Sequence, residues 1–102
     1  MQTIQHQPTS YATYAEAVAA QRARTIDQAE ALYDALGDKE LRVAELVKMT
    51  RRQPAWREVD EAKRHRTVLD RLDMLEAAGR IITVRYEPGP RGSKIRVVRR
   101  RV

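Results

Sequence analysis

The stretch Thr67–Val98 constrains the fold most strongly, because its hydrophobic period changes from that of a helix to that of a strand. Leu69, Leu72 and Leu75 follow the repeat of an amphipathic helix. Gly79 then supplies the left-handed conformation in which helices commonly end. Beyond this glycine, apolar and polar side chains alternate as they do in a strand. The stretch therefore predicts a helix, a glycine stop and a two-stranded hairpin.

The same stretch contains the pattern Leu-x-x-Leu-x-x-x-Gly-x-Ile, followed by the turn Gly89-Pro-Arg-Gly92. This order resembles the recognition helix and wing of winged helix-turn-helix domains. The resemblance implies a mainly α fold with a C-terminal β-hairpin, in which residues 39–49 form the support helix. Over residues 39–98 the chain is also loosely similar to the winged domains of phage and plasmid primase–helicase proteins, which share a longer link between these two helices.

Composition indicates one folded domain. The chain has 102 residues, of which 42% are apolar and 33% charged, which is typical of a folded protein with a modest core. The absence of cysteine excludes disulfides and thiolate metal sites, and with two histidines we expect neither a metal site nor a cofactor. No run is long and apolar enough to span a bilayer, and no signal-peptide pattern is present, so we expect a cytoplasmic protein without a membrane partner.

The first third of the chain predicts a long helix. Residues 1–8 are polar and are expected to be disordered, and the helix should begin near Thr9 or Ser10 and end at Gly37. It is either one helix of more than 25 residues or two helices separated near Thr25, where a capping-box pattern starts. Its alanine-rich start should pack across its own core, or against a second copy or another protein, which leaves a homodimer or a larger replication or regulatory assembly open.

A second helix is predicted from Lys39 to about Met49, with Asp38 as its cap, and a third over residues 58–78. Pro54 argues against a helix in the link between them. The predicted core stripe of helix 58–78 is Ala62, His65, Leu69, Leu72 and Leu75, which would make His65 a packed residue. Trp56, which precedes this helix, is expected to cover the edge of the core, with base stacking as the alternative.

Positive charge increases along the chain. Residues 1–50 have five basic against seven acidic residues, residues 51–78 seven against six, and residues 79–102 eight against one. The excess therefore lies in the hairpin and in the basic tail 99–102, beyond the domain predicted over residues 9–98. Such an asymmetry indicates a polyanionic partner, and a solvated tail that aids solubility is the alternative.

Several basic side chains are placed where a winged domain would meet DNA. If helix 58–78 docks in or beside the major groove, its middle, around Arg64 and Thr67, should make the contact, because acidic residues occupy its first turns. The alternative is a solvated face with internal ion pairs. The hairpin tip over residues 87–94 should contact the backbone or the minor groove. The candidate DNA-contacting residues are Arg51, Arg52, Lys63, Arg64, Arg66, Thr67, Arg71, Arg85, Arg91, Lys94, Arg96, Arg99, Arg100 and Arg101.

The sequence contains no glycine-rich phosphate loop, metal-ligand spacing or nucleophile motif, so an enzyme is not expected. The predicted function is binding of double-stranded DNA, in transcription regulation or in replication of a mobile element. The alternative is a winged-helix docking or dimerisation module without DNA readout. Binding of single-stranded DNA or RNA is disfavoured, because Tyr86 is the one aromatic residue of the hairpin.

Overall fold

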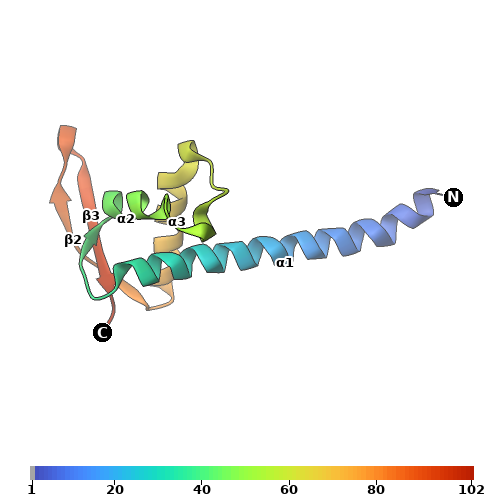
Figure 1. Cartoon of the computed structure of the whole chain (residues 1–102), viewed down its shortest axis with the longest axis horizontal. Coiled ribbons are helices and arrows are strands. Elements are labelled where there is room, and N and C mark those ends of the chain that lie inside the picture. The colour runs from blue at the N-terminus through green and yellow to red at the C-terminus, as the bar shows by residue number, and fades with distance from the viewer. Residues whose placement is uncertain (1) are drawn as a thin grey trace.

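The computed structural model describes residues 2–102, and the side chains of residues 13–102. Its fold is mainly helical with a small antiparallel sheet at the C-terminal end, as the sequence predicts (Figure 1). In chain order the elements are α1 (Gln2–Leu36), β1 (Leu41–Arg42), α2 (Val43–Thr50), the 3-10 turn η1 (Pro54–Trp56), α3 (Glu61–Ala77), β2 (Ile81–Pro88), the 3-10 turn η2 (Pro90–Gly92) and β3 (Lys94–Arg100).

Helix α1 is continuous, which confirms the one-helix alternative and excludes the predicted break near Thr25. It begins at Gln2, earlier than the predicted start at Thr9 or Ser10. Pro8 falls within it, and because proline has no amide N–H, one backbone hydrogen bond of the helix is absent there. Only the C-terminal part of α1 lies against the other elements, while the rest projects away from them (Figure 1).

The core lies where the end of α1 meets α2, α3 and the sheet. Leu32 and Leu36 of α1 are fully buried there, as are Leu46 of α2, Leu72 of α3 and Val98 of β3. Because most helical stability in proteins comes from tertiary packing, burial of these side chains holds the elements together.

The sheet has three strands in the order β1-β3-β2, all antiparallel. Strand β1 was not predicted: Leu41 and Arg42 pair with Val98 and Val97 of β3. As a result α2 begins at Val43 and not at Lys39, and Asp38 is not its cap. The backbone N–H of Arg42 instead donates to the carboxylate of Glu45 at 2.9 Å, which secures the first turn.

The predicted hairpin is confirmed. Strands β2 and β3 pair from Ile81 opposite Arg100 to Pro88 opposite Lys94. Their register shifts between Thr83 and Arg85, so Val84 forms a bulge. A bulge increases the local twist of a strand pair and redirects the hairpin that follows it.

Helix α3 is rotated relative to the predicted stripe. Arg64, Val68, Leu72 and Leu75 are its buried residues, whereas His65 is exposed, so the prediction of a packed His65 was wrong. The helix begins at Glu61, with the carboxylate of Asp60 accepting a hydrogen bond from the N–H of Ala62 at 3.2 Å.

The rotation follows from how the link is packed. Trp56 at the end of η1 is fully buried, and its indole N–H donates to the carbonyl of Gln28 in α1 at 3.2 Å. The ring therefore belongs to the core, more deeply than the expected position at its edge, and is not available for base stacking. The chain from Thr50 to Asp60 is thus an ordered layer between α1 and α3.

Candidate nucleic-acid interface

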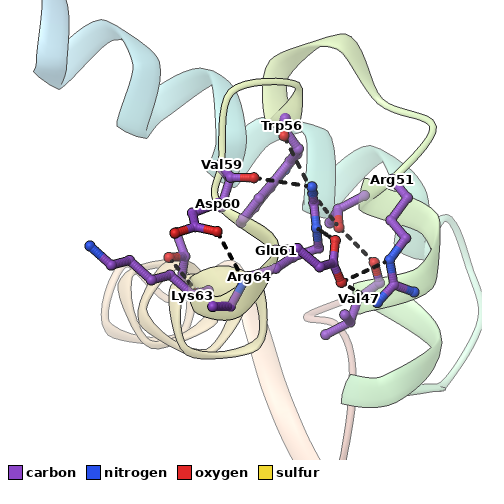
Figure 2. A network of polar contacts seen from close by, with 11 residues as sticks. Val47, Arg51, Trp56, Val59, Asp60, Glu61, Lys63 and Arg64 are labelled. Carbon is purple, nitrogen blue, oxygen red and sulfur yellow. Dashed lines mark hydrogen bonds and ion pairs between the residues drawn. The ribbon is translucent and has the colours of Figure 1, made fainter.

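Arg64, the residue expected to read bases, is a buried structural residue. Its side chain is 9% exposed. Figure 2 shows its guanidinium inside the link that precedes α3, where it donates to the carbonyls of Trp56 and Val59, each at 3.3 Å. It also donates to Thr50 Oγ1 at 3.3 Å and to Glu61 Oε1 at 2.9 Å. These bonds use both ends of the guanidinium, so Arg64 is a packed residue in this fold and not the exposed one that the predicted DNA contact requires.

Glu61 joins this buried arginine to an exposed one. Its second carboxylate oxygen accepts from Arg51 at 2.5 Å, also visible in Figure 2. Hydrogen bonds from Arg51 and Arg64, together with their charges, lower the pKa of Glu61 to about 2. The ion pair between Arg51 and Glu61 therefore links the end of α2 to the start of α3 and neutralises the charge of Arg51.

Arg96 connects the hairpin to α3. Its side chain is 12% exposed and forms ion pairs of 2.9 Å with both Asp73 and Glu76 of α3. Its Nε also donates to Thr83 Oγ1 on the neighbouring strand at 3.0 Å. Arg96 therefore fixes the position of the hairpin relative to the helix and has little capacity left for a phosphate.

A second ion-pair group lies where β1 meets the hairpin. Arg85 contacts Glu40 at 2.7 Å and Glu87 at 2.9 Å, and Arg42 contacts Glu87 at 2.8 Å. Hydrogen bonds from Arg42 and Arg85 hold the pKa of Glu87 below its usual value. The sequence prediction counted Arg85 as a DNA contact, but its charge is balanced within the sheet.

Three further arginines rest on α1. The guanidinium groups of Arg80 and Arg100 lie about 4.0 and 4.1 Å from the centre of the Tyr33 ring. Arg80 also pairs with Glu30, and Arg71 donates to the side-chain oxygen of Gln28 at 3.0 Å. Two members of the predicted DNA-contacting set, Arg71 and Arg100, thus stabilise the helix packing.

The remaining predicted residues separate into two groups. Thr67 and Arg99 are half-buried and donate to the carbonyls of Lys63 and Arg100. In the part of the chain that the structure describes, the predicted cations that are exposed and lie in no carboxylate pair are Arg52, Lys63, Arg91, Lys94 and Arg101. Arg66 is intermediate: its side chain is 81% exposed, like those of the unpaired cations, but it forms a long ion pair of 3.6 Å with Asp70.

Two of these cations lie on the hairpin tip. The tip is closed by hydrogen bonds from the N–H of Gly89 to the carbonyl of Ser93 at 2.8 Å and from the N–H of Ser93 to the carbonyl of Pro90 at 3.1 Å. Arg91 at the apex has a left-handed conformation with φ of +57°, which is unusual for a residue other than glycine. The backbone of the tip is therefore well defined and presents the Arg91 side chain to solvent.

A groove runs between α3 and the hairpin. His65, Arg66 and Leu69 lie on its helix wall, and Tyr86 and Lys94 on its hairpin wall. Further along the helix the groove is lined by Asp70 and Asp73. The positive end of the groove is therefore the end formed by the first turns of α3 and the hairpin tip.

Sequence reasoning missed Arg57. With Arg51 and Arg52 it surrounds a shallow recess at the link, above the buried Arg64 and Trp56. Arg57 is exposed and forms no carboxylate pair among the described residues. The cluster Arg-Arg-x-x-x-x-Arg in the sequence could have indicated it, but only the folded link brings the three arginines to one surface.

No known protein family, no curated protein and no solved structure matches the chain at a significant level. None of the helices among residues 2–102 has both the length and the apolar character needed to cross a membrane.

Proposed function

We propose that the chain is a winged helix-turn-helix domain that binds double-stranded DNA through its wing. The order α1-β1-α2-α3-β2-β3, with β1 on the outer side of β3, supports this fold assignment. In this proposal α2 is the support helix, α3 the recognition helix and the tip of β2 and β3 the wing. We further propose that the domain acts in the cytoplasm, in transcription regulation or in replication of a mobile element.

The division between paired and unpaired cations carries the proposal. Arg64, Arg85 and Arg96 are neutralised by nearby carboxylates. Arg91 and Lys94 at the tip are exposed and unpaired among the described residues. An unpaired cation can release counterions from DNA without first breaking an internal ion pair, so it contributes most to phosphate binding.

Helix α3 is expected to approach DNA through residues 63–66 only, because the exposed carboxylates of Glu58 and Asp60 precede them. Lys63, His65 and Arg66 are exposed there and can donate to phosphates or base edges. Asp70 and Asp73, one and two turns later, would repel phosphates if the whole helix entered the major groove. The wing tip and the N-terminal part of α3 together form the proposed interface, with the arginine recess of the link as an additional phosphate contact.

The test is fluorescence anisotropy with labelled duplex DNA, single-stranded DNA and RNA of the same sequence. The duplex should bind most tightly, and replacing both Arg91 and Lys94 by alanine should weaken duplex binding at least tenfold. The matched control is the double variant Arg42→Ala/Arg85→Ala, which removes the same net charge from paired positions. Equal losses in the two double variants, or no duplex binding at low salt, would refute the proposed interface.

A second candidate function is a protein-interaction module. The observation that favours it is the projecting part of α1 (Figure 1), in which residues 13–24 are exposed except for the half-buried Val18. This surface lies away from the wing tip, so both functions are compatible with one chain.

A further inference from the structure

The N-terminal part of α1 is a projecting helix without a partner. Burial of its side chains begins at Gln28 and Ala29, whereas residues 13–24 are exposed except for the half-buried Val18. The segment from Gln2 to Ile26 is about 36 Å long at 1.5 Å per residue. Isolated helices gain little stability in water, and most helices in proteins depend on packing of an apolar face.

The face of α1 that enters the core continues into this projecting part. Leu36, Leu32 and Gln28 are buried at a spacing of four residues, and Val18 and Tyr14 continue the same side of the helix. Tyr14 is 68% exposed, although its ring is largely apolar. When the apolar face of a helix extends beyond the core of its own domain, that exposed part of the face indicates a contact with another molecule.

The stripe ends in a groove at the junction of α1 and α3. The groove is lined by Val18, Gln21, Arg22, Thr25, Ile26 and Met74. Ile26 is 56% exposed and Met74 is 41% exposed, so the apolar side chains of the groove are open to solvent. A helix from another molecule would contact mainly α1 in this groove, and Met74 of α3 at its edge.

Charge indicates which helix fits. Residues 2–15 contain no Asp, Glu, Lys or Arg, although 33% of the whole chain is charged. Interface cores are depleted in charged residues, so this uncharged helix segment is itself suited to burial in a groove between two molecules. The occupant that these properties fit is therefore the same segment of a second copy.

Charge also indicates the direction of pairing. In a parallel pair Arg22, which lies on the same side of the helix as Val18, would face its equivalent, and the two positively charged domains would lie at the same end. An antiparallel pair avoids this like-charge contact and separates the domains. Tyr14 is the midpoint of residues 2–26, so pairing about Tyr14 brings the first turns of each helix to the groove of the other copy.

We propose that α1 forms an antiparallel homodimer centred on Tyr14, in which the N-terminal turns of each copy cover the Val18–Ile26–Met74 groove of the other. The contact is one helix face, about 36 Å long and about 10 Å wide. This is smaller than a standard interface of roughly 1,600 Å² in total. The dimer should therefore dissociate on dilution.

Sedimentation equilibrium of the full chain over a range of concentrations tests the dimer. The wild-type chain should be dimeric at high concentration, and Val18→Glu should raise the dissociation constant at least tenfold. Ala23→Glu is the matched control, because Ala23 is exposed on the opposite side of α1. A wild-type chain that is monomeric throughout, or equal effects of the two substitutions, would overturn the proposal.

Cysteine cross-linking tests the direction and register, since the chain has no cysteine of its own. Tyr14→Cys should form a disulfide dimer, whereas Val18→Cys alone should not, because residues 18 would lie about 12 Å apart along the helices, beyond the ~7 Å limit for a disulfide. A mixture of Val18→Cys and Ser10→Cys should cross-link. A homodimeric disulfide of Val18→Cys as abundant as that of Tyr14→Cys would contradict the antiparallel arrangement.

Discussion

Replacing Arg64 should affect stability far more than it affects DNA contact. Arg64→Ala removes a side chain that is 9% exposed, and with it three hydrogen bonds in the link, to Thr50 Oγ1 and to the carbonyls of Trp56 and Val59. The Trp56 carbonyl still accepts from the N–H of Val59, and the Thr50 hydroxyl still donates to the carbonyl of Val47. All three groups nevertheless lose a charged donor in a region that water reaches poorly, which is costly. The matched control is Arg66→Ala, whose side chain is 81% exposed on the same helix.

The magnitude follows from these contacts. Each of the three hydrogen bonds is taken as about 1 kcal/mol, below the roughly 1.5–3 kcal/mol of a bond to a charged group, because at 3.3 Å all three are long. The ion pair with Glu61 adds little, because that carboxylate is 60% exposed and keeps Arg51 as a partner. The expected loss is about 3 kcal/mol, or roughly 15 °C in Tm for a domain of this size.

The assay is urea unfolding followed by far-UV circular dichroism and by the fluorescence of Trp56, which lies in the same layer. Arg66→Ala should change the free energy of unfolding by less than about 0.5 kcal/mol. If Arg64→Ala is no less stable than Arg66→Ala, the guanidinium does not hold the link, and the structural role assigned to it is refuted.

Three further outcomes are expected. The pKa of Glu61 is lowered from 4.5 to about 2. Glu61→Gln should therefore lower the free energy of unfolding by a constant amount above pH 4.5, by less as the pH falls towards 2, and not at all below pH 2. A loss that does not depend on pH in acid unfolding curves would contradict this. Arg91→Gly should be more stable than Arg91→Ala by about 1 kcal/mol in urea unfolding, because only glycine relieves the positive φ; equal stability would argue against that strain. Arg96→Ala should lower the free energy of unfolding by about 1 kcal/mol and should speed amide hydrogen exchange in the hairpin but not in α2. Unchanged exchange in the hairpin would show that Arg96 does not anchor it to α3.

The hairpin was predictable because its signals are local. The glycine stop after α3, the alternation of the strands and the proline-glycine tip all act within a few residues. Strand β1 was not predictable in this way. Leu41 and Arg42 are too few to show a strand period, and their conformation depends on pairing with Val97 and Val98, far along the chain.

The sequence could not indicate which basic side chains are buried or paired, and Arg64 shows why. An arginine among charged neighbours is normally assigned to the surface, and the apolar stripe through His65 and Leu69 was equally regular in the sequence. The ordered link decides which face of α3 is buried, because it places three polar acceptors beside Arg64. Which cations remain unpaired, as Arg91 and Lys94 do, likewise depends on contacts between residues distant in sequence.

The salt dependence of duplex affinity distinguishes DNA binding by the wing cations, which form no ion pair among the described residues, from DNA binding by the paired arginines. Each phosphate contact contributes about 0.9 to the slope of log affinity against log salt. Arg91→Ala/Lys94→Ala should therefore reduce the slope by roughly 2, and Arg42→Ala/Arg85→Ala should leave it unchanged. An unchanged slope in the wing variant, or an equal reduction in the paired-arginine variant, would contradict the account.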